Sequence, residues 1–209
     1  MAKPYDPSGR ALNPYRGAEL NIGSKGEKTR GDIVRCAKRL FYEQGYEGTS
    51  FSDIVASSGL YRGNIYHYFK TKDEILGAVI EQHLEEFRGL LAQWDKKYDD
   101  PKEKLRAFVT MITGRQRELV EYGCPIGSLN TELGKDKRDL QQAARALFDL
   151  FRDWLAARFT ELGKGEGAKV FALHLLGRAQ GIAVIAHVYQ DTALLRHETT
   201  QLHAWIEQL

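Results

Sequence analysis

The sequence predicts an all-α fold in which a small N-terminal three-helix domain precedes a larger helical domain. Apolar side chains recur every three or four positions through most of the chain after residue 28, which is the spacing of a buried helix face. No segment keeps the period-two alternation of a half-buried strand. Only 5 of the 209 residues are proline, so few positions would break a helix.

Composition is that of a globular protein, with 43% hydrophobic and 28% charged residues. No stretch approaches the roughly 18 uncharged apolar residues of a membrane span, and the N-terminal residues lack the apolar centre of a secretory signal. The two cysteines, Cys36 and Cys124, are too few for a disulfide scaffold. We therefore expect a cytoplasmic protein without a membrane partner.

Charge is divided unevenly along the chain. Residues 1–72 carry 12 Lys and Arg against 7 Asp and Glu, a net charge of +5, whereas residues 73–209 carry a net charge of −3. A basic module on a mildly acidic body indicates contact with a polyanion at one end. Residues 1–25 are rich in proline and glycine and predict a flexible basic arm. This arm is either a disordered tail or a contact to DNA phosphates or the minor groove.

Local signals place three helices after the arm. The first helix runs from about residue 28 and ends at Gly45, which serves as a C-terminal cap. Ser50, followed three positions later by Asp53, is typical of a capping box at the start of the second helix. Gly59 supplies the backbone freedom for a turn, and the third helix covers about 62–69.

Two short helices joined by a tight glycine turn match the helix-turn-helix that enters a major groove. Ile54, Ile65 and Phe69 are expected to pack the two helices together. The outward face of the second helix would carry Arg62, Gly63, Asn64, Tyr66, His67 and Tyr68. Arginine and asparagine can read guanine and adenine edges, while tyrosine hydroxyls and Lys72 suit phosphates. Residues 26–72 are therefore predicted to bind DNA, with a plain three-helix cap as the alternative.

Six further helices are predicted from apolar spacing and breakers in residues 73–209. Pro101 is typical of a first helical turn, and glycines after 162 end a long helix. The expected ranges are about 72–94, 101–122, a short helix after Gly123-Cys124-Pro125, 138–162, 168–190 and 192–208.

The string FYEQGYEGTSFSDIVASSGLYRGNIYHYFKTKDEIL (41–76) resembles the N-terminal signature of the TetR family of transcriptional regulators. The resemblance implies a homodimer whose first three helices bind a double-stranded DNA operator, while residues 73–209 hold the effector and dimer surfaces. It implies base contacts for Arg62, Gly63 and Asn64. Tyr61 stands where the family often has Ser or Thr as a helix cap. It implies contacts to the DNA phosphate backbone for Thr49 or Ser50, Tyr66, His67, Tyr68 and Lys72.

Cys124 precedes Pro125, so its sulfur is expected at a helix N-terminus, where the helix dipole favours a thiolate. A structural thiol, a redox or electrophile sensor and a direct effector contact all remain open for it. Residues 123–133 resemble the GC-x-x-G-x-L-x-x-E-L motif of one TetR subgroup, some of whose members respond to small electrophiles or unsaturated compounds. Cys36 is expected in the core.

An effector pocket is expected among the helices that follow residue 72, because such pockets are mostly apolar with a few polar groups. No glycine-rich phosphate loop, nucleophile elbow or metal cluster is present in the sequence, and His174 and His187 lie too far apart along one helix to share an ion. We therefore predict no cofactor, metal or catalytic residue. The predicted pocket residues are Trp94, Phe108, Met111, Arg115, Cys124, Phe148, Phe151 and His174.

The last two predicted helices, 168–190 and 192–208, are expected to form a four-helix dimer interface with their symmetry mates. Gly177 and Gly181 permit close approach in the first, and leucines with Trp205 and Ile206 give the second an apolar face. The sequence thus predicts a ligand-responsive repressor that binds a near-palindromic operator. A DNA-binding activator or ligand-independent regulator of the same fold, and a thiol-dependent enzyme using Cys124, are the alternatives.

Overall fold

The structure, a computed structural model, describes residues 25–209, and every regular element within this range is helical. The all-α prediction is therefore confirmed. The predicted arm, residues 1–25, lies outside the described residues except for Lys25, where the first helix begins. The N-terminal part contains α1 (Lys25–Gln44), α2 (Phe51–Ser58) and α3 (Arg62–Tyr68). The larger part contains α4 (Lys72–Lys97), α5 (Pro101–Gly114), α6 (Gln116–Tyr122), α7 (Pro125–Asp136), α8 (Arg138–Glu161), a 3₁₀ turn η1 (Gly165–Gly167), α9 (Ala168–Tyr189) and α10 (Thr192–Glu207).

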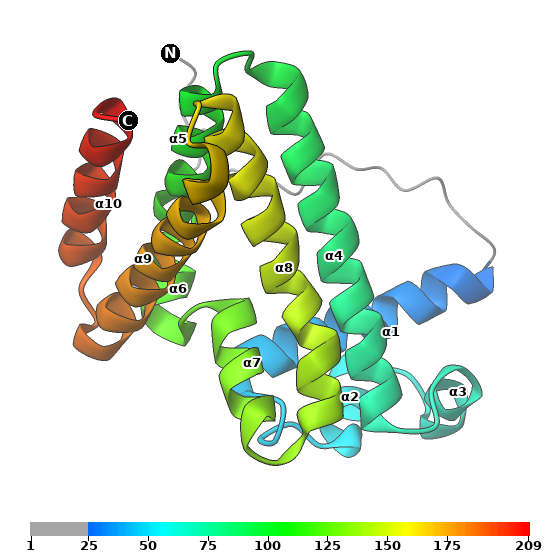
Figure 1. The fold of residues 1–209 in the computed structure, drawn as a ribbon. Coiled ribbons are helices and arrows are strands. Elements are labelled where there is room, and N and C mark those ends of the chain that lie inside the picture. The colour runs from blue at the N-terminus through cyan, green and yellow to red at the C-terminus, as the bar shows by residue number, and fades with distance from the viewer. Residues whose placement is uncertain (1–24) are drawn as a thin grey trace, which may run out of the picture.

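The long helix α8 lies at the centre of the larger part, with α4 along one side and α9 along the other (Figure 1). Helix α10 packs against α5 and α9, and α6 packs against α9. Helix α1 crosses behind the lower half of α4 in Figure 1, packs against it, and also contacts α2 and α7. As a result, α3 and α10 lie on opposite sides of the molecule.

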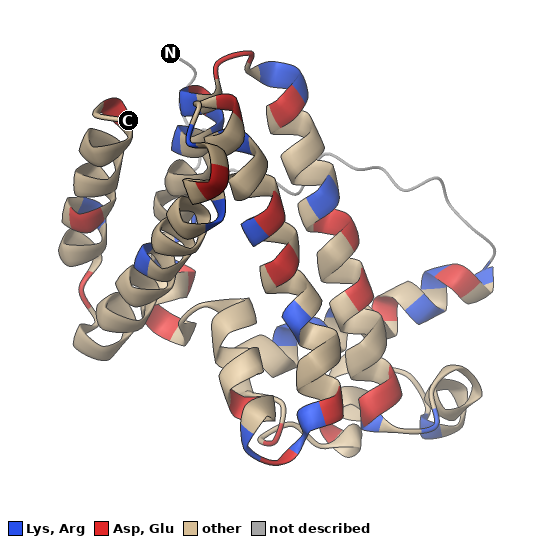
Figure 2. Ribbon diagram, in the orientation of Figure 1, with Lys and Arg blue, Asp and Glu red and all other residues tan. Residues whose placement is uncertain are grey.

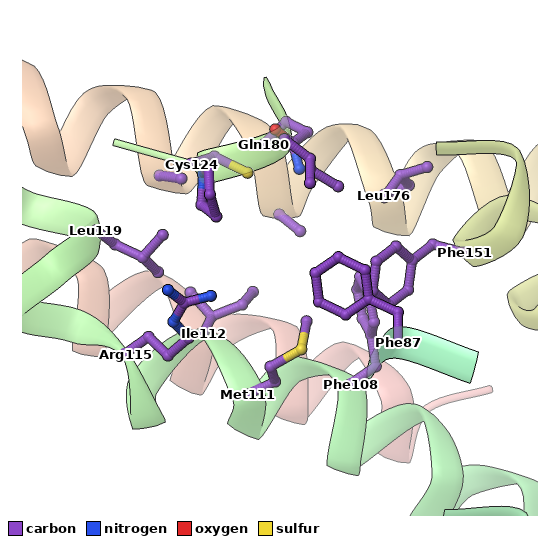
Figure 3. A pocket seen from close by; sticks show the side chains of 14 residues that line it. Phe87, Phe108, Met111, Ile112, Arg115, Leu119, Cys124, Phe151, Leu176 and Gln180 are labelled. Carbon is purple, nitrogen blue, oxygen red and sulfur yellow. The ribbon is translucent and has the colours of Figure 1, made fainter. Parts of the chain in front are cut away.

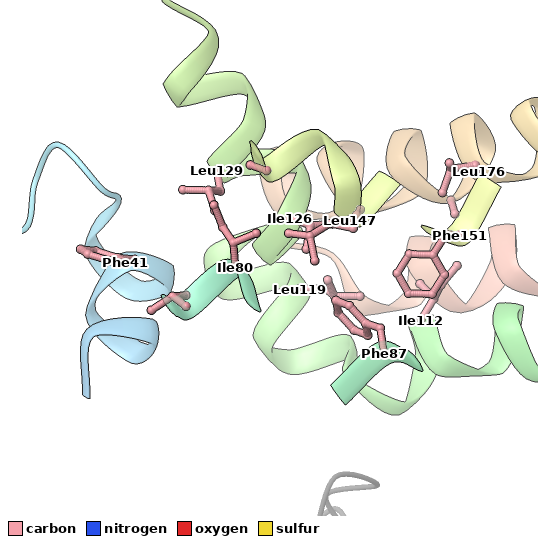
Figure 4. Packing of buried hydrophobic residues seen from close by; sticks show 14 of the residues in the cluster. Phe41, Ile80, Phe87, Ile112, Leu119, Ile126, Leu129, Leu147, Phe151 and Leu176 are labelled. Atoms are coloured by element: carbon pink, nitrogen blue, oxygen red, sulfur yellow. The ribbon is translucent and has the colours of Figure 1, made fainter. Parts of the chain in front are cut away.

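One hydrophobic core joins the small and large parts. It runs from Phe41 on α1 through Ile80 on α4 and Leu129 on α7 to Leu176 on α9 (Figure 4). All four side chains are buried. The apolar face of α1 therefore packs directly on helices of the larger part, without an intervening linker.

The single helix predicted over 101–122 is wrong, because the structure divides it into α5 and α6 at Arg115. The backbone of Arg115 has φ −119° and ψ 22°, outside the helical region. Its N–H donates to the carbonyl of Ile112 in a tighter i to i−3 turn (3.3 Å). The break lets α6 turn onto α9, where Leu119 and Val120 are buried.

Candidate DNA-binding helices and effector cavity

Helix α2 begins with the capping box that the sequence predicts. The Ser50 hydroxyl accepts from the Asp53 N–H (3.1 Å), and the Asp53 carboxylate accepts from the Ser50 N–H (2.7 Å). These hydrogen bonds hold the pKa of the Asp53 carboxyl below its usual value. Gly59 ends the helix with φ +69°, a conformation that a Cβ disfavours. The turn between α2 and α3 is thus fixed by local chemistry.

Helix α3 presents an exposed polar face next to its buried side chains. Arg62, Gly63, Asn64, Tyr66 and His67 are exposed, and Tyr68 is half-buried. Ile65 and Phe69, together with Ile54 of α2, form the buried side of the helix pair. The α3 residues predicted to face DNA are therefore accessible, Tyr68 only in part.

An aromatic shelf on α2 and α3 holds the Arg62 side chain. The rings of Phe51 and Tyr66 stack with centroids 4.7 Å apart. The Arg62 guanidinium lies 5.5 Å from the centroid of the Tyr66 ring and donates to the Tyr66 hydroxyl (3.3 Å). Tyr61 caps α3 without a side-chain hydrogen bond, but its carbonyl accepts from the Asn64 N–H (2.9 Å). Helix α3 therefore has a regular first turn even though Tyr61 stands where the resembled family often has Ser or Thr.

The predicted phosphate contact of the Thr49 side chain does not fit its position. Thr49 is completely buried, and its hydroxyl donates to the carbonyl of Gly45 (2.8 Å). Of the two residues predicted at the start of α2, the structure therefore leaves only Ser50 exposed. Lys72 is half-buried, and its Nζ donates to the carbonyls of Tyr46 (2.8 Å) and Thr49 (3.0 Å). An ammonium has three donors, so one remains for a phosphate.

A mostly apolar cavity lies inside the larger part, lined by α4, α5, α6, the start of α7, α8 and α9 (Figure 3). Phe87, Phe108 and Phe151 gather at one end, while the Arg115 guanidinium lies at the other. Such a lining, apolar with a few polar groups, is typical of small-molecule sites. The remaining lining residues are Met111, Ile112, Leu119, Cys124, Pro125, Ile126, Leu176, Ala179, Gln180 and Ala183.

Five of the eight predicted pocket residues line this cavity: Phe108, Met111, Arg115, Cys124 and Phe151. The other three do not, because their side chains lie on parts of α4, α8 and α9 that face away from the cavity. Trp94 lies further along α4 and packs against Trp154 with the two rings tilted (5.7 Å between centroids). Phe148 packs on the core elsewhere, and His174 is exposed on α9. Gln180 was not predicted, since a polar residue in an apolar helix gives no signal of facing a cavity.

Cys124 is the N-cap of α7 as well as part of the cavity wall. Its Sγ accepts from the Gly127 N–H (3.4 Å) and the side chain is half-buried. The predicted position at a helix N-terminus is therefore confirmed. Cys36 is also half-buried and packs against the core.

A buried histidine adjoins the aromatic end of the cavity. The His83 ring stacks on that of Phe87 (5.6 Å between centroids), and its Nδ1 has no hydrogen-bond partner among residues 25–209. Burial, with smaller contributions from the nearby charges of Lys38 and Arg115, lowers the pKa of His83 to about 3. The imidazole is therefore neutral at physiological pH.

An apolar stripe on the outer face of α9 is exposed in the single chain. The helix carries only two charged side chains (Figure 2), and the segment Gly165–Tyr189 is long and apolar enough to cross a membrane. Its inner face packs on α8, however, as in the core helix of a globular protein. We call the exposed residues the α9 stripe: Val170, Leu173, Val184, Ile185, Val188 and Tyr189.

The apolar face predicted for the last helix is not part of this exposed surface. Leu195, Leu202 and Ile206 are completely buried within the subunit, where α10 packs on α5 and α9. The free apolar surface of this pair of helices therefore belongs to α9.

Two stretches of the chain match known protein families. Residues 33–79 match the family described as bacterial regulatory proteins of the tetR family, and residues 101–201 match the C-terminal domain of LmrA/YxaF-like transcriptional regulators. An uncharacterized HTH-type transcriptional regulator of Lactococcus lactis, from the lacX 3′ region, is 27% identical over 87% of this chain and 94% of that protein. The HTH-type regulator YfiR of Bacillus subtilis is 37% identical over 60% of each chain.

Solved structures show the same fold. A TetR transcriptional regulator from Chloroflexus aurantiacus superposes with a TM-score of 0.77 at 29% identity, covering 88% of this chain and 96% of that one. NemR of Escherichia coli, in its reduced form, gives a TM-score of 0.74 at 17% identity over 83% of this chain and 94% of that one.

Proposed function

Because this chain belongs to the TetR family of DNA-binding transcriptional regulators, we propose that it is a cytoplasmic, ligand-responsive repressor. In this proposal residues 26–72 bind DNA and residues 73–209 bind the effector and form a homodimer. The observation that carries it is the cavity beside α4, because Phe87 in its wall lies on the helix that leads directly into the DNA-binding helices.

Base reading is assigned to the exposed face of α3. Arg62 and Asn64 have the side chains that pair bidentately with guanine and adenine, and Arg62 must leave its aromatic shelf to do so. Gly63 between them permits close approach to the base edges. Phosphate contacts that fix the protein in register are assigned to the following residues: Ser50, Tyr66, His67, Tyr68 and Lys72.

The α9 stripe is assigned to the dimer interface, since monomeric proteins rarely expose a large continuous apolar patch. Gly177 and Gly181 lie between its residues, and a Cβ at either would meet no atom within 4 Å. This space admits a second helix at close range. A two-fold dimer would place two α3 helices on one near-palindromic operator.

The effector is assigned to a small, largely apolar molecule with a hydrogen-bonding group. Three phenylalanines would take its apolar part, while Arg115 and Gln180 would bind its polar group. Cys124 in the same wall leaves open an electrophile that forms a bond to sulfur. Binding favours release when the effector binds the released conformation more tightly than the DNA-bound one. Movement of α4 would then change the spacing of the two α3 helices.

The test begins with unbiased selection of genomic DNA fragments bound by the full chain, followed by titration with metabolites of the adjacent pathway. An effector that lowers affinity for the selected DNA must itself bind more weakly when that DNA is present, because the coupling is reciprocal. Failure to select any DNA fragment would contradict operator binding. Selected DNA without any responsive ligand would favour a ligand-independent regulator, and turnover of an electrophile that requires Cys124 would favour an enzyme.

A further inference from the structure

Helix α7 connects the cavity to the DNA-binding part without passing through α4. Its first turn lines the cavity with Cys124, Pro125 and Ile126. Glu132 follows eight positions after Cys124, about 12 Å along the helix axis. At that distance α7 has left the cavity and reached α1.

The Glu132 carboxylate binds the turn between α1 and α2. Its Oε2 accepts from the N–H of Tyr46 (2.9 Å), and its Oε1 accepts from the N–H of Glu47 (2.8 Å). Hydrogen bonds from backbone amides to a carboxylate are stronger than those between neutral groups. The preceding Gly45 has φ +80°, and a Cβ there would lie 3.0 Å from Oε1. The turn is therefore shaped to receive this carboxylate.

The same turn is held from its other side by α4. Lys72 binds the carbonyls of Tyr46 and Thr49, and the Tyr46 hydroxyl donates to Asp73. Tyr46 is completely buried between these contacts. Because Ser50 at the end of the turn caps α2, the position of this turn fixes where α2 and α3 begin.

A second contact joins the start of α7 to α1. The Tyr42 hydroxyl donates to the carbonyl of Gly123 (2.9 Å), immediately before Cys124. The Arg115 guanidinium in the cavity wall lies 5.8 Å from the centroid of the Tyr42 ring. The segment just before α7 is thus held by the last turn of α1, and Glu132 near the other end of α7 is held by the α1–α2 turn. The first of these contacts borders the cavity.

We propose that α7 transmits occupancy of the cavity to the DNA-binding helices, and that Glu132 is the positioning residue at its far end. A group that displaces the first turn of α7 would move the Glu132 carboxylate and release the α1–α2 turn. This inference rests on the proposed ligand control of DNA binding. It adds a second route of coupling, through α7 and Glu132, to the movement of α4.

The first experiment tests the contact itself. Amide hydrogen exchange is measured by NMR on the full chain, comparing Glu132→Ala with Glu85→Ala, which removes the same charge from an exposed α4 residue. We expect exchange of the Tyr46 and Glu47 amides to accelerate about tenfold or more in Glu132→Ala and to stay near the parent rate in the control. Glu132→Gln replaces Glu132→Ala if the latter does not fold. Unchanged exchange at both amides would overturn the proposal.

The second experiment tests transmission, with N-ethylmaleimide as a probe of known position. In a Cys36→Ala background, the Cys124 thiolate adds to the maleimide double bond, and the adjacent carbon takes a proton from water. Binding to a genomically selected DNA fragment is then followed by fluorescence anisotropy. We expect alkylation to weaken binding by roughly 5- to 150-fold in the parent and the Glu85→Ala control. In Glu132→Ala, the logarithm of the fold-change in DNA affinity on alkylation should be less than half of its value in the parent.

The outcomes separate the two proposals. An equal effect of alkylation in the parent and Glu132→Ala would refute transmission through Glu132 while leaving ligand control intact. No effect in the parent would contradict control of DNA binding from this cavity, and the inference would fall with it.

Discussion

Replacing Val184 and Val188 of the α9 stripe by serine together should raise the dimer dissociation constant about a thousandfold. Val184 is 55% exposed and Val188 66% exposed in the single chain. Complete burial of such a side chain contributes about 1.5–3 kcal/mol, so the remaining half contributes about 1 kcal/mol. A two-fold interface contains each residue twice. The pair of substitutions therefore removes about 4 kcal/mol, or roughly 10³ in the dimer dissociation constant.

Sedimentation velocity across nanomolar to micromolar concentrations measures this dissociation constant directly. Circular dichroism establishes that the doubly substituted chain keeps its helix content, as expected for exposed positions. The matched control is Tyr61→Ser, which removes an apolar side chain that is 85% exposed on the DNA-binding part. The control should dimerise as the parent does. A parent that is monomeric at micromolar concentration, or a doubly substituted chain that dimerises equally well, would refute the assignment of the stripe.

Three further predictions concern DNA binding and pH. Arg62→Ala should lower affinity for selected DNA by about 1–3 kcal/mol and relax base preference; unchanged anisotropy titrations would remove Arg62 from the base-reading set. Lys72→Ala should weaken binding to all DNA and reduce the log–log salt slope by up to about one, and should lower the thermal midpoint because Nζ also holds the carbonyls of Tyr46 and Thr49; an equal slope would argue against the phosphate role. For His83, burial holds the pKa near 3 in the fold against 6.5 unfolded. The unfolded chain therefore binds a proton that the folded chain does not, and the free energy of unfolding should fall by roughly 2 kcal/mol between pH 7 and about pH 5. His83→Phe should abolish most of that fall in urea titrations, and an identical pH dependence in the variant would contradict the explanation.

The DNA-binding helices could be predicted because their signals are local. Ser50 and Asp53 form the capping box three positions apart, and Gly59 adopts the left-handed conformation that its missing Cβ allows. The exposed face of α3 follows from the same short-range pattern, since Ile65 and Phe69 take the buried side. The burial of Thr49 was not predictable, because the turn that holds it packs beneath Lys72, which lies 23 positions later and donates to the Thr49 carbonyl.

The cavity could be predicted only in part. Apolar spacing identifies which residues of a helix face inward, but Trp94 and Phe108 both satisfy that criterion and only Phe108 reaches the cavity. The break at Arg115 also escaped prediction, since only Gly114 hints at it, and the packing of α6 on α9 decides the bend.

By itself the sequence determined the helical fold, the family and the exposed polar face of α3. These properties depend on residues within one or two helical turns of each other. The tertiary structure alone decided which apolar face stays exposed, burying that of α10 and leaving the α9 stripe. It also brought Glu132 to the amides of Tyr46 and Glu47, more than eighty positions earlier in the chain. Neither result has a local signal, because each depends on how helices distant in sequence pack against one another.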